Sequence, residues 1–315
     1  MDYLYNELQK YGQVHARANL AKNATFHIGG EARFLIDVTE TDKFVGLLNY
    51  LLGEGIDWMI LGSGTNVLFN DEPFDGVVIK VLTKKVTANG NEVEAEAGAL
   101  LSNVMSVAMK AGLTGLEWTM GVPGTIGGAV RGNAGAMGRD IASSITKVEA
   151  WQDGEVKYFT RPECKFVYRG SIFKDKEKKL VILRMWLLLI PGDRAASLAD
   201  MKKYMMQRQG RYPVEPSAGS FFKNIKMEQW KGNKDLLPPL FLERGSIPVG
   251  WLVERCNMKG YAVGGAKISD IHGNFLINFN NATQKDVLAV VEKVKQAVYD
   301  KFGITLEPEV EIIKN

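Results

Sequence analysis

Glycine is concentrated in one part of the chain, where the backbone rather than side chains could bind a ligand. Glycine accounts for 33 of the 315 residues, and nine of these lie from Gly112 to Gly138. Within this stretch, GVPGTIGGAVRGNAG (121–135) contains six glycines. Glycine costs folding entropy, up to about 1 kcal/mol relative to alanine in regular structure, so such a cluster indicates that the main chain approaches something closely. Apolar neighbours suit a flat hydrophobic ligand and backbone N–H groups suit a diphosphate, although tight turns between strands would explain the same residues.

A second small-residue loop, GSGTN (62–66), directly follows the apolar segment WMIL (58–61). It is not a Rossmann fingerprint, because Val67 stands where the third glycine would fall, and the chain contains no Gly-Lys pair to form a Walker A loop. Its glycines allow positive φ angles and its N–H groups could point at an anion, although an ordinary tight turn is the alternative. Two such loops together favour a dinucleotide held by backbone groups.

Three dispersed groups of polar residues could carry chemistry. Arg169 lies in YRGS, where its guanidinium group could bind a carboxylate through two hydrogen bonds. Ser220 lies in SAGSFFKN beside two aromatic residues. Glu307 and Glu309 alternate along a strand-like segment, which would place them on one face. Each has an ordinary alternative, since Arg169 could pair with a surface acid, Ser220 could cap a turn and Glu309 could face water.

The apolar pattern predicts an α+β chain in which helices and strands alternate, with a seam between two halves at residues 191–193. Helical periodicity predicts helices over residues 42–53, 99–111, 195–209, 250–256 and 283–301. Apolar runs or alternation predict strands over residues 58–61, 77–82, 147–152, 156–160, 180–190, 274–279 and 304–314. The Asn-Gly pair within residues 85–98 predicts a hairpin.

The composition excludes several classes of function. Apolar residues make up 46% and charged residues 24% of the chain, as in ordinary globular proteins, and 39 Lys and Arg against 36 Asp and Glu give a net charge of +3. So small an excess provides no electrostatic footprint for nucleic acid or an anionic membrane. Two cysteines and three scattered histidines suggest neither a disulfide framework nor a metal site. The most apolar stretch, residues 180–190, is too short to span a bilayer, so we expect a cytoplasmic protein.

Eight segments, in order and nearly end to end, resemble the UDP-N-acetylenolpyruvoylglucosamine reductase (UDP-N-acetylmuramate dehydrogenase, MurB) family of peptidoglycan synthesis. Any one segment alone would say little, whereas eight in register are strongly specific. They are TFHIGGEARF (25–34), LGSGTNVLF (61–69), GLTGLEWTMGVPGTIGGAVRGNAGAMG (112–138), YRGSIFK (168–174), PSAGSFFKN (216–224), GWLVERCNMKGYAVGGAKIS (250–269), HGNFLINFNNAT (272–283) and FGITLEPEVEII (302–313).

The resemblance implies a fold and a reaction. The implied fold is α+β, with a two-part FAD-binding domain of the PCMH/vanillyl-alcohol-oxidase type and a smaller α+β substrate-binding domain. FAD-binding subdomains would span residues 1–82 and 83–195, the substrate-binding domain 196–303, and a C-terminal strand carrying a catalytic Glu 304–315. FAD would bind non-covalently, and NADPH would drive reduction of the enolpyruvyl ether of a UDP-sugar to UDP-N-acetylmuramate. The expected partner is this small-molecule UDP-sugar, and we expect a monomer that binds neither nucleic acid nor membrane.

By this resemblance the two glycine-rich loops wrap the diphosphate and isoalloxazine of FAD. A covalent flavin bond from the loops is excluded, because no histidine or cysteine lies between residues 28 and 163. The resemblance assigns FAD binding to Gly62, Ser63, Gly64, Thr65, Asn66, Gly121, Val122, Pro123, Gly124, Thr125, Gly127, Gly128, Ala129, Asn133, Ala134 and Gly135.

The resemblance also assigns catalytic roles. Ser220 matches the proton donor, and Arg169 and Glu309 match the two residues at the substrate carboxylate. Hydride addition to the terminal enolpyruvyl carbon moves negative charge toward the neighbouring carbon and its carboxylate, and preorganised charges such as that of Arg169 can stabilise it by roughly 3–4 kcal/mol. A protonated Glu309 would donate a hydrogen bond there. Substrate contacts are implied for Tyr168, Lys223, Asn224 and Glu254.

Some positions depart from the family pattern. The short path from YRGSIFK to residues 180–183 leaves no room for the long tyrosine-bearing insertion of one subclass, so the subclass lacking it is the closer match. Residues 225–249 are nevertheless longer than that subclass usually shows and resemble the tyrosine-loop subclass more, which leaves open how the UDP diphosphate is held. Ile225 stands where proline is expected, and Gly273 where alanine is common.

Two other functions fit part of the pattern. Another FAD-dependent oxidoreductase of the same fold, such as a sugar or alcohol oxidase, would share the glycine-rich loops but would not need GSFFKN or EPEV. A non-catalytic protein that binds a UDP-sugar or a flavin would need no catalytic set, yet all three candidate catalytic residues lie in intact motifs.

Overall fold

A computed structural model describes residues 3–314 of the chain. Within this range the chain forms two compact units, the first made of residues 3–18, 32–63 and 75–208 and the second of residues 19–31, 64–74 and 209–314. Each unit has its own hydrophobic core. The chain thus crosses between the units several times, and each unit is assembled from segments that are distant in sequence.

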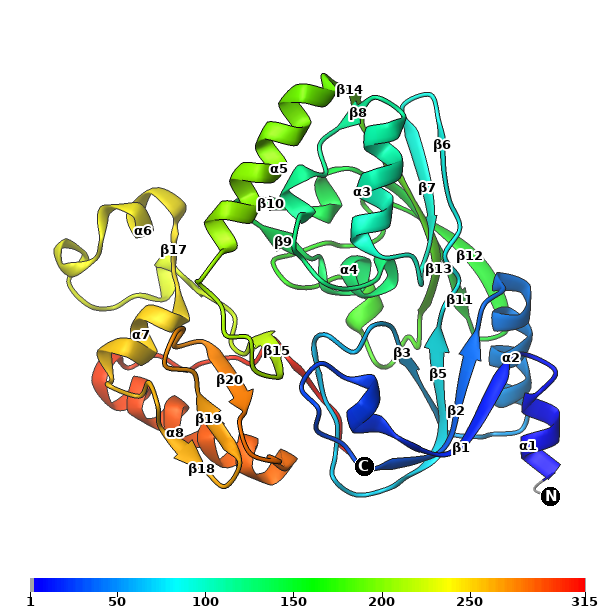
Figure 1. The fold of residues 1–315 in the computed structure, drawn as a ribbon, viewed down its shortest axis with the longest axis horizontal. Coiled ribbons are helices and arrows are strands. Elements are labelled where there is room, and N and C mark those ends of the chain that lie inside the picture. Colours follow the sequence, from blue (N-terminus) through cyan, green and yellow to red (C-terminus); the bar gives the residue numbers. More distant parts are fainter. Residues whose placement is uncertain (1–2, 315) are drawn as a thin grey trace. The chain divides into compact units, whose positions relative to one another are not determined.

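A four-stranded sheet with the order β1-β2-β5-β3 forms one part of the first unit (Figure 1). The helix α2 (Thr41–Gly53) packs its apolar stripe into the same core, where Phe44, Leu47, Leu48 and Leu51 are fully buried. The edge strand β3 is parallel to β5, and the connection between them, residues 62–73, contains β4 but no helix. The four strands are β1 (Gln13–Asn19), β2 (Glu31–Val38), β3 (Trp58–Leu61) and β5 (Phe74–Val81).

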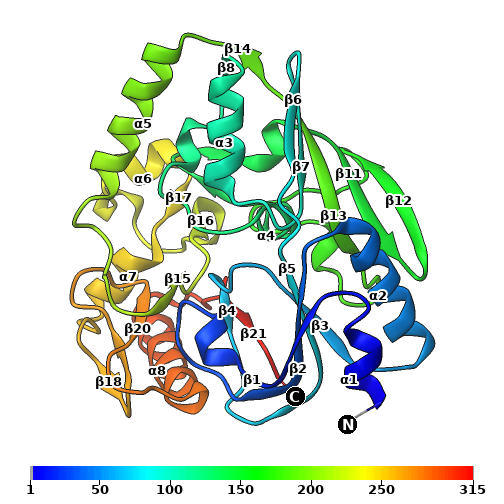
Figure 2. The same cartoon turned by 45° about the vertical axis from the view of Figure 1, so that its right-hand side comes forward.

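A five-stranded antiparallel sheet with the order β12-β11-β13-β7-β6 forms the rest of the first unit (Figure 2). Helices α3 (Leu101–Lys110) and α4 (Ile126–Gly132) pack against it, and α5 (Arg194–Arg208) packs against the 3-10 helix η2 (Glu117–Thr119). The five strands are β6 (Val86–Asn89), β7 (Glu92–Glu96), β11 (Ile145–Gln152), β12 (Glu155–Thr160) and β13 (Val181–Leu188).

The second unit is built on a four-stranded sheet with the order β15-β20-β19-β18. Helix α8 (Gln284–Phe302) packs against this sheet and against α7 (Val249–Arg255). A capping box of Thr283 and Asp286 begins α8, and Gly303 in the left-handed conformation ends it. The strands are β15 (Ser217–Ser220), β18 (Ala262–Val263), β19 (Ala266–Ile268) and β20 (Phe275–Asn278).

Short elements complete both units. In the second unit, β4 (Val67–Leu68) pairs in parallel with β21 (Glu311–Ile312) near the C-terminus. The others are α1 (Tyr3–Leu8), η1 (Leu20–Asn23), β8 (Leu113–Thr114), β9 (Gly135–Ala136), β10 (Arg139–Asp140), η3 (Ile141–Ser143), η4 (Ile172–Lys174), β14 (Ile190–Pro191), β16 (Ile225–Lys226), η5 (Met227–Gln229), η6 (Lys234–Leu236), α6 (Pro239–Arg244) and β17 (Ser246–Ile247).

Most elements predicted from periodicity are confirmed to within a few residues, but the strand predicted over 304–314 is wrong except at Glu311–Ile312. Pro308, which has no N–H, forms only an isolated bridge to Phe222. The N–H groups of Glu309 and Glu311 bind carbonyls from two different segments, so no single ladder forms. The division at residues 82, 195 and 303 stays a prediction, and residues 1, 2 and 315 lie outside the described chain.

Two kinds of feature are absent from residues 3–314. No helix in this range is both long and apolar enough to cross a membrane. Nor does the same range contain a group of three or more His, Cys, Asp and Glu side chains that could hold a metal ion.

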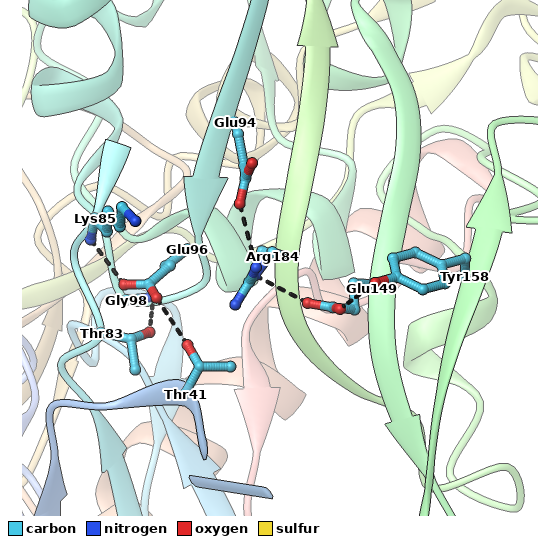
Figure 3. Close-up of polar contacts among 9 residues, drawn as sticks. All are labelled: Thr41, Thr83, Lys85, Glu94, Glu96, Gly98, Glu149, Tyr158 and Arg184. Atoms are coloured by element: carbon cyan, nitrogen blue, oxygen red, sulfur yellow. Dashed lines mark hydrogen bonds and ion pairs between the residues drawn. The ribbon is translucent and has the colours of Figure 1, made fainter. Parts of the chain in front are cut away.

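Charged side chains cross the five-stranded sheet from strand to strand (Figure 3). Arg184 Nε lies 2.9 Å from Glu149 Oε2 and Arg184 Nη1 lies 3.3 Å from Glu94 Oε1. The hydroxyl of Tyr158 donates to Glu149 Oε1 at 2.7 Å, and this hydrogen bond raises the pKa of Tyr158. Only 6% of Glu149 is exposed, so its carboxylate depends on these partners for the solvation that water would otherwise provide.

A second carboxylate in Figure 3, that of Glu96, joins helix α2 to the five-stranded sheet. Glu96, at the end of β7, accepts from Thr41 Oγ1 at the start of α2 and from the backbone N–H of Lys85, each at 2.8 Å. One side chain therefore fixes the start of α2 to the edge of the five-stranded sheet.

We predict that Arg184→Met lowers the free energy of unfolding by about 2 kcal/mol, because it leaves the buried Glu149 carboxylate without its cation. Lys157→Met is the matched control, since Lys157 pairs with Glu155 on the same sheet but both side chains are largely exposed. Chemical denaturation of both variants measures the difference. Equal losses for the two variants would contradict the prediction.

Candidate functional site

The two glycine-rich loops meet in the first unit. A Cβ atom at Gly62 would lie 2.5 Å from Thr125 Oγ1, closer than such atoms can approach. Thr125 is the N-cap of α4, and its hydroxyl oxygen accepts from the N–H of Gly128. Glycine is therefore required at residue 62 because the end of β3 lies directly against the start of α4. This contact supports the expectation that the two loops bind one ligand together.

Packing accounts for part of the glycine cluster. The N–H groups of Ile126 and Gly127 donate to the carbonyls of Ala99 and Ala97, each at 2.8 Å. A Cβ atom at Gly127 would lie only 3.3 Å from the Cβ atom of Ala97. These two N–H groups are thus used to hold α4 against the 97–99 segment, so they are not the groups that would face a diphosphate.

Arg208, the last residue of α5, places a cation beside the loop at residues 121–135. A Cβ atom at Gly121 would lie 3.1 Å from Arg208 Cδ, and Gly121 itself has a φ angle of +72°. The Nε and Nη2 atoms of Arg208 are buried and have no hydrogen-bond partner among residues 3–314. Two buried guanidinium nitrogens without partners are costly, so this position suits an anionic group of a ligand.

Sequence reasoning did not single out Arg208. Arg208 lies near the end of the helix predicted over 195–209. The sequence does not distinguish it from the other basic residues between 202 and 211. Only the packing of α5 shows which of them is buried against the glycine-rich loop.

Glu117 holds the start of α5 to the segment that leads into Gly121. Its carboxylate accepts from Thr114 Oγ1 at 2.6 Å, from Ser197 Oγ at 2.7 Å and from the N–H of Gly115 at 2.8 Å. Burial alone would raise the pKa of Glu117, but the hydrogen bonds outweigh it and the pKa is lowered. The ionised carboxylate therefore fixes α5, and with it Arg208, relative to the loop.

Arg169 lies against the end of the same loop. It occupies a tight turn in which Val167 and Gly170 exchange backbone hydrogen bonds, and it has a positive φ angle of 56°. Its Nη2 atom donates to the carbonyl of Gly135 at 2.9 Å, and its guanidinium group lies 5.2 Å from the ring centroid of Tyr168. The structure thus brings Arg169 and Tyr168 together with the 121–135 loop, as a shared site requires.

Asn133 has an internal structural role. It ends α4 in the left-handed conformation and is 4% exposed. Its amide donates to Asp140 and to the carbonyl of Val167, and its oxygen accepts from the N–H of Ala142. Through these bonds Asn133 holds the Arg169 turn in place. Any contact with a cofactor would come from its backbone.

In the second unit, a β-bulge places Ser220. The strand β15 pairs Ser217 with Ile277 and Ser220 with Phe275, so it holds one residue more than β20 between these pairs. Gly219, with a φ angle of +78°, is part of this bulge. In a regular strand Ser220 would share the buried face of Ala218 and Phe222, whereas here it is only partly buried. The bulge turns the hydroxyl out of the core.

Glu309 is hydrogen-bonded to Phe221, the residue that follows Ser220. The N–H of Glu309 donates to the carbonyl of Phe221 at 2.8 Å, and the carbonyl of Glu309 accepts from Asn66 Nδ2 at 3.2 Å. Asn66 belongs to the GSGTN loop, in which a Cβ atom at Gly64 would clash with the carbonyl of Asn23. The second unit therefore joins Ser220, Glu309 and part of that loop in one hydrogen-bonded arrangement.

The predicted substrate residues of the second unit have mixed surroundings. Lys223 forms an ion pair with Glu307, and its N–H donates to the carbonyl of Glu307 at 2.9 Å. Asn224 accepts from the N–H of Val249, which fixes the end of the GSFFKN segment to α7. Glu254 is exposed and pairs with Lys259 at 3.1 Å. The backbone of Lys223 thus pairs with that of Glu307 and lies beside the 307–309 segment.

The other predicted residues lie within the loops already described. Val122 and Ala134 are held by backbone hydrogen bonds to Thr119 and Ala129. Gly124, with a φ angle of +130°, accepts from the N–H of Leu101. Ser63, Thr65 and Pro123 are partly buried or exposed members of the same loops.

We predict that Gly219→Ala lowers the free energy of unfolding by about 1 kcal/mol, because alanine is strained at this φ angle although no atom blocks its methyl group. Gly303→Ala is the matched control, with a φ angle of +65° and equally open space at the end of α8. Both variants should lose similar stability in chemical denaturation. A neutral Gly219→Ala beside a destabilised Gly303→Ala would show that the bulge adapts without strain.

Comparisons with known families and structures agree with this geometry. Residues 32–157 match the FAD binding domain, and residues 210–313 match the family described as UDP-N-acetylenolpyruvoylglucosamine reductase, C-terminal domain. The first match contains the whole of both loops, 62–66 and 121–135, and the second contains Ser220 and Glu309. The predicted α+β fold class with an FAD-binding domain is confirmed.

Relatives match along almost the whole chain. A UDP-N-acetylenolpyruvoylglucosamine reductase of Caldanaerobacter subterraneus is 36% identical over 310 residues, covering 98% of this chain and 96% of that protein. The Bacillus subtilis protein of the same name is 33% identical and covers 99% of both. The crystal structure of the Thermus caldophilus protein (MurB) has a TM-score of 0.76 at 30% identity and covers 96% of this chain and 99% of that one. The chain belongs to the UDP-N-acetylenolpyruvoylglucosamine reductase, or MurB, family.

Proposed function

We propose that the chain binds FAD non-covalently through the loops at residues 62–66 and 121–135. The residues present suit the group: the contact between Gly62 and Thr125 joins the two loops, and Arg208 offers a buried cation to an anionic part of the cofactor. Glycines at 121 and 124 allow the backbone to approach a flat ring system closely. Arg208 is added here to the residues assigned by the sequence.

The proposed reaction is the NADPH-driven reduction of UDP-N-acetylglucosamine enolpyruvate to UDP-N-acetylmuramate, a step of peptidoglycan precursor synthesis. The observation that carries it is the bulged strand that turns Ser220 out of the core and links it through Phe221 to Glu309. An oxidase that shares only the FAD-binding domain has no need of this arrangement. The arrangement lies within the C-terminal domain particular to this family.

FAD held by the two loops would supply the hydride after its reduction by NADPH. Arg169, held by Gly135, stabilises the negative charge that develops on the substrate carboxylate and the adjacent carbon. The hydroxyl of Ser220 then donates a proton to that carbon, and position matters more than pKa because this carbon is a strong base. Glu309 in its protonated form donates a hydrogen bond to the same carboxylate.

The remaining proposals concern substrate contacts, localisation, oligomeric state and subclass. Tyr168, Lys223, Asn224 and Glu254 contact the UDP-sugar. The enzyme acts as a cytoplasmic monomer whose partner is this small molecule. The subclass lacking the tyrosine loop remains the proposed place of the chain within the family.

The first test is an anaerobic experiment on the purified protein. The visible spectrum reports bound flavin, NADPH should bleach it, and the enolpyruvyl UDP-sugar should restore the oxidised spectrum. A flavin that recovers only with oxygen would instead support the oxidase alternative. A colourless protein that cannot be reconstituted with FAD would contradict the proposal.

We predict that Ser220→Ala still allows NADPH to bleach the flavin but slows its reoxidation by the UDP-sugar by a factor of roughly 10² to 10⁴, the usual contribution of a positioned proton donor. Ser217→Ala, on the same strand, is the control and should reoxidise at a near-normal rate. Stopped-flow absorbance measures both half-reactions. If Ser220→Ala also abolished flavin reduction, the assignment of Ser220 would be wrong.

We predict that Arg208→Met weakens FAD binding by about tenfold or more, which corresponds to roughly 1.4 kcal/mol. The FAD-free variant should be at least as stable as the parent, because it no longer buries an unpaired cation. Flavin fluorescence titration and thermal denaturation of the FAD-free proteins measure the two effects. Arg194→Met, at the exposed start of the same helix, is the control, and an unchanged FAD affinity in Arg208→Met would overturn this role.

A further inference from the structure

Asn274 binds the segment that follows Ser220 through both the oxygen and the nitrogen of its side-chain amide. Its Oδ1 atom accepts from the N–H of Phe222 at 2.9 Å, and its Nδ2 atom donates to the carbonyl of the same residue at 2.8 Å. Its backbone carbonyl accepts from the N–H of Phe221 at 2.8 Å. Asn274 is 2% exposed and Phe222 is 1% exposed, so water does not replace these bonds.

The position explains why an asparagine is needed. The ladder between β15 and β20 reaches Ser220 and Phe275, and then the chain before Phe275 turns away. In this turn the N–H of Phe275 donates to the carbonyl of His272, and the N–H of Asn274 donates to His272 Nδ1. No backbone amide is left to pair with Phe222. The carboxamide of Asn274 offers a donor and an acceptor like those of a peptide group. It therefore replaces the backbone hydrogen bonds that a continued ladder would give to Phe222.

Phe221 and Phe222 also hold the segment that contains Glu309. The N–H of Phe221 donates to the backbone carbonyl of Asn274, and the carbonyl of Phe221 accepts from the N–H of Glu309. Phe222 bridges to Pro308, one residue before Glu309. The peptide groups of 221 and 222 are therefore the common support of Ser220, which precedes them, and of Glu309, which pairs with them.

We propose that Asn274 is a positioning residue that sets the geometry of Ser220 relative to Glu309 for proton delivery. The inference rests on the proposed function of these two residues and adds a third residue that the sequence did not point to. Asn274 acts only through the backbone of Phe221 and Phe222. Losing its carboxamide leaves a buried N–H and a buried carbonyl unpaired, so the segment shifts to find new partners.

The test compares two asparagines of similar setting. Asn274→Leu removes both hydrogen bonds to Phe222 at similar volume, and Asn274→Asp keeps the shape and the acceptor but turns an oxygen toward the carbonyl of Phe222. Asn278→Leu is the control, because Asn278 ends β20, the strand that Asn274 precedes, and its side chain also binds backbone groups: the carbonyls of Phe26 and His27 and the N–H of Ala282. All three variants are made in the full chain with FAD bound.

Hydrogen–deuterium exchange of the peptides covering residues 218–224 tests the structural step without any activity. We expect faster exchange in this segment for both Asn274 variants and no change there for Asn278→Leu. Stopped-flow measurements test the chemical step. We expect flavin reduction by NADPH at the parent rate, and reoxidation by the enolpyruvyl UDP-sugar about 10²-fold slower with an increased solvent deuterium isotope effect.

The outcomes separate this inference from the proposed function. If exchange at 218–224 is unchanged in Asn274→Asp and Asn274→Leu, the inference is overturned, whatever the activity. If both half-reactions slow equally, or if Asn278→Leu shows the same selective loss, Asn274 has only a structural role and the inference is again overturned. If the parent protein itself is not reoxidised by the UDP-sugar, the proposed function fails, and with it the positioning role.

Discussion

The contact between Gly62 and Thr125 is the constraint on which the arrangement of the first unit depends. It joins the end of a strand in one sheet to the first residue of a helix that packs on the other, with no room for a side chain between them. The hydrogen bonds of Ile126 and Gly127 to Ala99 and Ala97 fix the same helix to the second sheet. Close packing, rather than a charged pair, thus places Gly62 against the start of the helix that follows Thr125.

In the second unit, backbone hydrogen bonds rather than close packing position the predicted site residues. Its functional segment is extended, with two fully buried phenylalanines in succession, and buried peptide groups need partners. The partners come from the turn at Asn274 and from the segment around Glu309. A bulge at Gly219 then decides which way Ser220 faces. Positions of side chains are set here by where backbone hydrogen bonds can be made.

The sequence predicts well what depends on local pattern. The helix α2 and the strand β3 agree with their predicted limits almost to the residue, because apolar spacing and a flanking glycine determine both. Residues 304–314 show the limit: their alternation suits a strand, but a strand needs a continuous partner and this segment finds several short ones. Arg208 and Asn274 escaped prediction for a related reason. Their importance comes from burial against distant segments, which spacing along the chain does not reveal.

The C-terminal segment has a consequence for how the protein is made. Glu309 pairs with Phe221, Glu311 and Ile312 pair with Val67 and Leu68, and the side chain of Gln284 binds the carbonyl of Ile313. These contacts join parts of the chain that leave the ribosome far apart in time. The backbone at Phe221 therefore gains its partner at Glu309 only after residue 309 has been synthesised, so a shorter nascent chain that has already formed the first unit would still lack this support for the segment that contains Ser220.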